Sequence, residues 1–226
     1  MSKTQDQLTT NNPAFYLHYA WVIVAIAAVM QMVGASIRMA FGVFIDPLSE
    51  NFDWGQGPIT LAYAINAVVS AIASPLAGWV GDRYGTRKAM SIGGILFILG
   101  MLLTGMITEL WQFYLAFGLL LGVAQSIFLV PLVPGVMGWY RRHLGWGMGL
   151  LMASWGLGPA IAAPLIGFLI IEIGWQGAFW ATATGSAIIM TILIFFYRNT
   201  PADAGTVPYG TLPGEKLPET KKQDSI

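Results

Sequence analysis

The chain has 226 residues, of which 56% are hydrophobic and 10% are charged, and its formal net charge is zero. A soluble domain has about 25% charged residues, so this chain is not expected to cover a water-exposed globule. It contains no cysteine, which excludes disulfides and thiolate metal sites. The hydrophobic residues form long blocks, and apolar runs of about 18 residues or more are typical of membrane-spanning helices. The sequence therefore predicts a polytopic membrane protein.

Six apolar segments follow a polar N-terminal stretch at residues 1–18. Each segment can cross a hydrocarbon core of about 30 Å at a rise of about 1.5 Å per residue. Because lipid offers no partner for open backbone groups, we expect all six to be helices. The predicted fold class is an all-α membrane protein with a six-span bundle at residues 19–197. The segments cover residues 19–45, 59–80, 89–107, 111–137, 146–171 and 177–197.

The basic residues predict the orientation of this bundle. All Lys and Arg residues except Arg38 lie in the N-terminal stretch, in the second and fourth loops and in the C-terminal segment, whereas the other three loops carry acids and no bases. The positive-inside rule then places both termini in the cytoplasm. The expected location of the bundle is the plasma membrane, or the inner membrane if the protein is bacterial. Residues 198–226 are polar and proline-bearing, which predicts a flexible cytoplasmic tail.

An internal repeat relates two of the segments. AIASPLAGWVGDRYG at residues 71–85 is similar to AIAAPLIGFLIIEIG at residues 160–174, with seven of fifteen positions identical and an offset of 89 residues, or three spans. Under the orientation above, the two copies cross the membrane in opposite directions. The repeat is then inverted, an internal symmetry of many secondary transporters. The alternative is a chance match between two helices rich in Ala, Pro, Leu and Gly.

The loop sequence GWVGDRYGTRK at residues 78–88 places one acid among three bases. The predicted membrane orientation explains the bases of this loop, but it does not explain the acid or the spacing of the glycines. A glycine at 78 would let another helix approach closely, and a glycine at 85 would supply a turn with positive φ. The pattern G-x-x-x-D-R-x-G-x-R-K resembles the loop 2–3 signature of the major facilitator superfamily. The resemblance implies a conformational latch that closes on a second helical half; its residues would be Gly78, Asp82, Arg83, Gly85, Arg87 and Lys88.

Further stretches resemble the monocarboxylate transporter and oxalate–formate antiporter branch of that superfamily. They are SIRMAFGVFIDPLSENFDWG, LWQFYLAFGLLLG, GWQGAFW and RNTPADAGTVPYG. WYRRHLGWGMGLL is similar to the loop 4–5 signature, with Arg141 and Arg142 as its basic pair, although the pair stands about two residues further from the helix glycines. The resemblance implies one half of a twelve-span transporter, built as a three-plus-three inverted repeat and moving a small organic anion by alternating access.

Arg38 is the one base inside a predicted span. A charge there costs roughly 2.5–3.5 kcal/mol on insertion scales and by default indicates function. Together with Gln31, Gly34 and Ala35 it forms a polar, small-residue face at helical spacing. We expect this face to line a cavity where the guanidinium pairs with a substrate carboxylate. The alternative is that Arg38 snorkels to the outer interface.

Neutral polar residues are further candidates for substrate binding: Tyr63, Asn66 and Ser70 on one face of the second segment, and Gln125 and Ser126 in the fourth. Such residues also serve as interhelical hydrogen-bonding groups, so that structural role remains open for each of them. Both histidines lie near the ends of apolar runs, and the sequence shows no nucleophile–base or metal cluster. We therefore expect no enzymatic activity, no metal and no cofactor. Nucleic-acid binding is excluded because the bases are few and orientation explains them.

The expected partners are the lipid bilayer, a small organic anion with a proton or a counter-anion, and a second six-helix half. That half could be another chain or a second copy of this one. No carboxylate lies in the middle of a span, so the chain offers no obvious proton carrier. The alternative functions are a truncated or non-transporting membrane subunit that needs a partner chain, and a major facilitator half with a different substrate.

Overall fold

The computed structural model describes residues 19–211, and their regular secondary structure is helical, with a single isolated bridge between Tyr140 and Tyr209. Five helical stretches are long and apolar enough to cross a membrane. The prediction of an all-α protein with several helices able to span a membrane is confirmed. The elements are α1 (Tyr19–Met39), η2 (Ala40–Phe44), α2 (Ile45–Phe52), α3 (Gln56–Tyr84), α4 (Thr86–Thr104), α5 (Leu110–Phe113), the π-helix η3 (Tyr114–Leu120), α6 (Leu121–Leu129), α7 (Leu132–Met137), α8 (Leu144–Phe196) and η4 (Ala202–Ala204).

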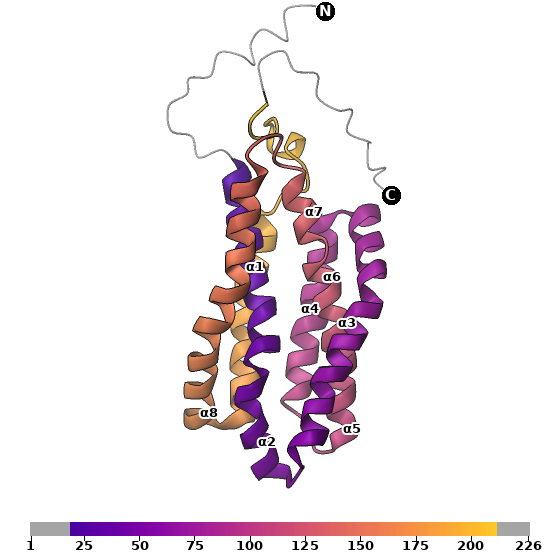
Figure 1. Ribbon diagram of the computed structural model, residues 1–226, viewed down its shortest axis with the longest axis vertical. Helices are drawn as coiled ribbons and strands as arrows, with labels where there is room; N and C mark the ends of the chain where they lie inside the picture. The colour runs from indigo at the N-terminus through magenta and orange to yellow at the C-terminus, as the bar shows by residue number, and fades with distance from the viewer. Residues whose placement is uncertain (1–18, 212–226) are drawn as a thin grey trace, which may run out of the picture.

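The last two expected segments form one element, α8, without an intervening loop. A straight helix of its 53 residues would be about 80 Å long. Instead the backbone leaves the helical region at Gly174 (φ 75°, ψ 169°) and the chain turns back. A Cβ at Gly147, near the start of α8, would lie 3.5 Å from Val24, and the Tyr19 hydroxyl donates to the carbonyl of Phe196. Both ends of α8 therefore lie beside the first turns of α1 (Figure 1).

The two copies of the sequence repeat end in nearly the same backbone conformation. Gly85 joins α3 to α4 with φ 85° and ψ 151°, and Gly174, 89 residues later, has φ 75° and ψ 169°. This region of φ and ψ is open essentially to glycine alone. Among the described residues, the non-glycine positions with positive φ are Asp53, directly after α2, and His143, directly before α8.

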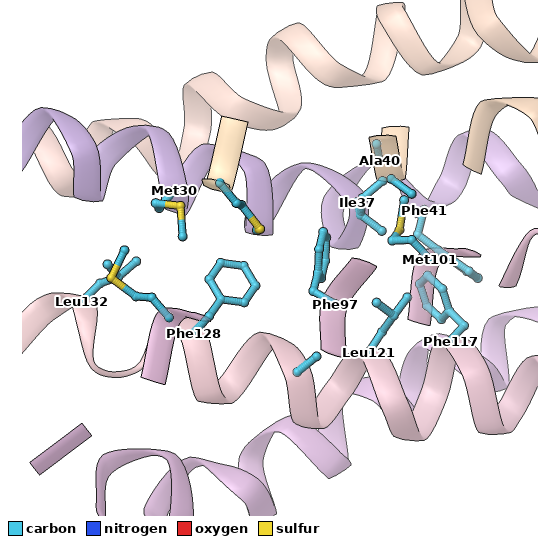
Figure 2. Packing of buried hydrophobic residues seen from close by; sticks show 14 of the residues in the cluster. Met30, Ile37, Ala40, Phe41, Phe97, Met101, Phe117, Leu121, Phe128 and Leu132 are labelled. Carbon is cyan, nitrogen blue, oxygen red and sulfur yellow. The ribbon is translucent and has the colours of Figure 1, made fainter. Parts of the chain in front are cut away.

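The core joins three helical stretches. Figure 2 shows Phe97 of α4 between the α1 ribbon and the α6 ribbon, with Phe128 of α6 turned toward α1. The rings of Phe97 and Phe128 stand edge to face at 5.5 Å between centroids, and those of Phe41 and Phe117 lie 4.8 Å apart. Such pairs prefer these geometries and add to the apolar burial. A Cβ at Gly93 of α4 would lie 2.6 Å from the Phe128 backbone nitrogen, so glycine is what lets α4 and α6 meet so closely.

The two ends of the bundle differ in charge. One end holds α2, α5 and the Gly174 turn, and the other holds α7, the Gly85 turn and the chain after α8 (Figure 1). The first end carries the acids of the expected outer loops: Asp46, Glu50, Asp53, Glu109 and Glu172. The opposite end carries Arg83, Arg87, Lys88, Arg141, Arg142 and Arg198. This separation is the pattern on which the predicted membrane orientation depends.

Residues 199–211, which the sequence assigns to a flexible tail, lie against the bundle. The Tyr209 N–H donates to the Trp139 carbonyl at 2.8 Å, and the Arg141 N–H donates to the Tyr209 carbonyl at 2.9 Å. The Tyr209 ring stands edge-on to Trp21 and Tyr140, at 6.0 and 5.6 Å between centroids. Burial, and secondarily the neighbouring Tyr209, raise the pKa of Tyr140 above its ordinary value.

Candidate functional site

A cavity of about 200 Å³ opens between α1, α3, α6 and α8. Its wall combines the polar face of α1 with small and polar residues of α3 and α6 and one large aromatic side chain from α8. No carboxylate lies among the described residues that line it. The residues with chemistry to offer are Arg38, Ser70, Ser74, Gln125, Ser126 and Trp155.

Arg38 lies in the last turn of α1, is half-buried and lines this cavity. Its guanidinium carbon lies 5.9 Å from the centre of the Tyr63 ring, within the range of a cation–π contact. It forms no ion pair with any acid among residues 19–211. A cation–π contact contributes about 0.5–2 kcal/mol and does not neutralise the charge. The cavity therefore carries an uncompensated positive charge and suits an anion.

Gln125 faces the same cavity from α6 and is 2% exposed. Its Nε2 donates weakly, at 3.5 Å, to the carbonyl of Gly34, one turn before Arg38 on α1. Its buried Oε1 has no hydrogen-bond partner among the described residues. The structure thus brings together Arg38 and Gln125, with Tyr63 beside Arg38.

Two other candidates lie elsewhere. Gln31 is buried, and its Nε2 donates to the Leu151 carbonyl at 3.2 Å, which ties α1 to α8. It lines a neighbouring cavity of about 360 Å³ that shares the Trp155 wall. Asn66 is fully buried and donates to the carbonyl of Phe117, in the π-helix η3, at 2.9 Å. Neither residue lines the Arg38 cavity, and each makes the interhelical contact that is the alternative to substrate binding.

Sequence reasoning missed Ser74 and η3. Ser74 follows Ser70 by one helical turn, so the same-face spacing could have found it. The π-helix has no comparable signal, because it is a local change of hydrogen-bond register that only tertiary contacts select. It matters because π-helical turns are frequent at functional sites.

A second cavity, of about 230 Å³, lies at the basic end beside the latch motif, and Asp82 is among its lining residues. The expected positive φ at Gly85 is present, at 85°. The expected close helix approach at Gly78 is not seen within the described chain, since a Cβ there would meet nothing within 4 Å. The close approach falls instead at Gly81, where a Cβ would lie 2.8 Å from Cβ of Pro131.

The bases of the latch motif differ in their surroundings. Arg87 donates from Nε to the Ile194 carbonyl at 3.0 Å and from Nη2 to the Phe195 carbonyl at 3.5 Å, at the C-terminal end of α8. Its backbone N–H donates to Oδ1 of Asn199 at 2.8 Å. Arg83 is exposed, with its guanidinium carbon 5.5 Å from the Trp79 ring, and Lys88 is exposed. Arg87 therefore braces this helical bundle internally, a role that the latch motif alone does not predict.

Arg141 and Arg142 lie at the same end of the bundle. Their side chains are exposed, whereas both backbone N–H groups donate to the Tyr209 carbonyl, at 2.9 and 3.3 Å. The backbone of this basic pair thus adds to the contacts that hold the segment after α8 against the bundle.

Long apolar helices, charge segregated between two ends and an anion-suited cavity between helices define a polytopic membrane protein with the features of a transporter. A family model described as Major Facilitator Superfamily matches residues 22–221. The chain belongs to this superfamily, so it is a member of a family of transporters rather than enzymes, as the sequence resemblance predicts.

Curated relatives point to the branch. The chain is 29% identical to monocarboxylate transporter 13 of Bos taurus over 160 residues, and these aligned residues make up 71% of this chain and 38% of that protein. It is 26% identical to monocarboxylate transporter 11 of Homo sapiens and 24% identical to monocarboxylate transporter 12 of Homo sapiens, again over 71% of this chain and over 34% and 31% of those proteins. The chain therefore resembles the monocarboxylate transporter branch and spans about a third of the length of these relatives.

Proposed function

We propose that this chain is part or all of a secondary active transporter that moves a small organic anion, such as a monocarboxylate, by alternating access. The observation that carries the proposal is the cavity in which Arg38 has no acidic partner among the described residues. A guanidinium can bind a carboxylate through two parallel hydrogen bonds. The names of the relatives support the same substrate class.

The proposed membrane arrangement has six crossings in a three-plus-three inverted repeat, with both termini cytoplasmic. The break at Gly174 divides α8 into residues 144–173 and 175–196, about 45 and 33 Å long at 1.5 Å per residue, and either length can span a bilayer. The matching conformations of Gly85 and Gly174 support the repeat.

The proposed partner is a second six-helix half, from another chain or a second copy. Exposed apolar side chains recur at the same repeat positions on α3 and on the first part of α8, the helices that also supply Ser74 and Trp155 to the Arg38 cavity. These duplicated stripes, together with the open surface at Gly78, suit a helical partner that covers the cavity. The pairs are Leu61 and Leu150, Val68 and Leu157, Ile72 and Ile161, Leu76 and Leu165, and Trp79 and Phe168.

The coupling ion is a proton or a counter-anion. A counter-anion could use the same positive cavity, whereas a proton would need a carrier outside it, because its lining has no carboxylate. A proton-coupled mechanism is therefore expected to place its titrating group on the partner half.

The proposal is tested with the full chain in proteoliposomes and nanodiscs, by uptake and binding of labelled lactate, formate and oxalate. Replacing Arg38 by Ala removes a charged hydrogen bond to the carboxylate, which contributes about 1.5–3 kcal/mol to binding. Carboxylate binding should therefore weaken about 10- to 150-fold. The control is Arg198→Ala, which removes an exposed base outside the cavity and should bind like the native protein. Equal binding by native protein and Arg38→Ala would remove Arg38 from the site, and no carboxylate binding by native protein would refute the proposal.

A non-transporting membrane subunit is the second candidate, because the chain spans about a third of its relatives' length. Carboxylate binding without uptake, combined with a heteromeric native mass, would favour this candidate. Uptake by a homodimer would exclude it.

A further inference from the structure

Each serine hydroxyl around the Arg38 cavity donates its proton to a backbone carbonyl. Ser74 Oγ and Ser126 Oγ donate to the Ser70 carbonyl at 2.7 and 2.8 Å. Ser70 Oγ donates to the Gly122 carbonyl at 3.0 Å. A hydroxyl has one proton and two lone pairs, so while these hydrogen bonds are kept each serine has only lone pairs to offer a ligand.

The amide of Gln125 is oriented by its neighbour. Its Nε2 is the group nearest the Gly34 carbonyl, at 3.5 Å. Rotating the amide by half a turn would set Oε1 against that carbonyl oxygen, and two acceptors would then face each other. Oε1 is therefore the atom left over, and it is buried without a partner among the described residues. An unpaired buried acceptor is costly, and a bound donor would remove that cost.

Arg38 and Gln125 line the same cavity of about 200 Å³, so a small molecule bound there would meet both side chains. Gln125 contacts the carbonyl of Gly34, which precedes Arg38 by four residues, or about 6 Å along the helix axis. The wall of the cavity thus includes one cationic hydrogen-bond donor, the Arg38 guanidinium, and one side chain with an unpaired acceptor, Gln125.

We infer that Gln125 is a specificity-determining residue, which selects small carboxylates that carry a hydroxyl on the carbon next to the carboxylate over anions of the same size without it. This inference rests on the proposed anion-binding function. The carboxylate binds Arg38, and the hydroxyl donates to Gln125 Oε1. An unsubstituted anion leaves Oε1 unpaired, and a 2-oxo acid turns a second acceptor toward it. An ammonium in place of the hydroxyl would add a positive charge beside Arg38, so amino acids are disfavoured.

A site that hydrogen-bonds one group of its ligand discriminates strongly against analogues that lack it, because its own polar atoms are then left unpaired. For a single neutral hydrogen bond the expected preference is about tenfold. The neighbouring serines strengthen the preference, since they too offer acceptors alone.

The test measures binding of lactate, propionate and pyruvate to the purified full chain in nanodiscs, by isothermal titration. Native protein should bind lactate about tenfold more tightly than propionate or pyruvate. Gln125→Met keeps the unbranched shape without the acceptor, and should bring the three affinities within about twofold of one another. The control is Thr104→Val, which removes a buried hydroxyl that donates to the Gly100 carbonyl on α4 at 2.7 Å, outside the cavity; it should keep the native preference.

The possible results distinguish a wrong proposed function from a wrong role for Gln125. If none of the three anions binds, the proposed function fails and the inference fails with it. If native protein binds all three equally, the function stands and the selectivity is wrong. If Gln125→Met folds and keeps the tenfold preference, Gln125 is not the determinant. Should that variant unfold, the ligand series on native protein still decides whether the site recognises a hydroxyl.

Discussion

Arg87 and Lys88 are adjacent bases in one motif, and the structure predicts a loss of stability when Arg87 is replaced and almost none when Lys88 is replaced. Replacing Arg87 by Gln removes the guanidinium hydrogen bonds to the carbonyls of Ile194 and Phe195. A hydrogen bond from a charged group contributes about 1.5–3 kcal/mol. Arg87 is only half-buried and the second bond is long at 3.5 Å, so the lower end applies. Attraction to the helix C-terminus adds about 0.3–1 kcal/mol.

The expected loss for Arg87→Gln is about 2 kcal/mol in the free energy of unfolding. At about 2–4 °C per kcal/mol for a domain of this size, the unfolding midpoint in detergent should fall by about 4–8 °C. Lys88→Gln is the matched control, because that side chain is exposed and contacts no acid in the described part of the chain; its midpoint should move by less than about 2 °C. If Arg87→Gln unfolds like native protein, or if both variants lose the same amount, the proposed brace to α8 is wrong.

Two further predictions test contacts of α8 and of the segment after it. A Cβ at Gly158 would lie 2.7 Å from the Met32 carbonyl oxygen, whereas a Cβ at Gly156 would meet nothing within 4 Å. The unfolding midpoint of Gly158→Ala in a thermal melt should therefore lie about 2–12 °C below that of Gly156→Ala. Equal midpoints would contradict the close approach of α1 and α8. The raised pKa of Tyr140 means that the folded state favours the neutral phenol, so this contribution to stability is present below pH 10 and is lost as pH rises above it. Tyr140→Phe should flatten that alkaline loss in a pH series of unfolding midpoints, and an unchanged slope would assign the loss to other groups.

The spans and the charged loops could be predicted because each is a local property. An apolar run long enough to cross a membrane must be helical there, whatever it packs against. Expected and observed boundaries agree closely at Leu110–Met137, predicted as 111–137. They differ at Tyr19–Phe52, predicted as 19–45, because η2 and α2 continue the helix beyond the apolar run into polar residues.

The features that could not be predicted depend on contacts between distant parts of the chain. Nothing local shows that Gly174 would turn α8 back without loop residues, although its match to Gly85 in the repeat was available. The docking of Tyr209 requires Trp21 and Tyr140, which are far away in sequence. For the candidate site, helical spacing found the Arg38 face, but only the tertiary structure shows that Gln125 reaches it while Asn66 does not.

The hydrogen bond between Tyr19 and Phe196 joins the first described helix to the end of the last long one. A domain that starts and finishes at the same face can be copied in tandem, and the second copy then enters from the same side as the first. Gene fusion or duplication would thus preserve the orientation of each copy without any new helix to reverse it. Under the proposed six-crossing arrangement, a tag, a fluorescent protein or a second bundle joined before Tyr19 or after residue 211 should face the same compartment.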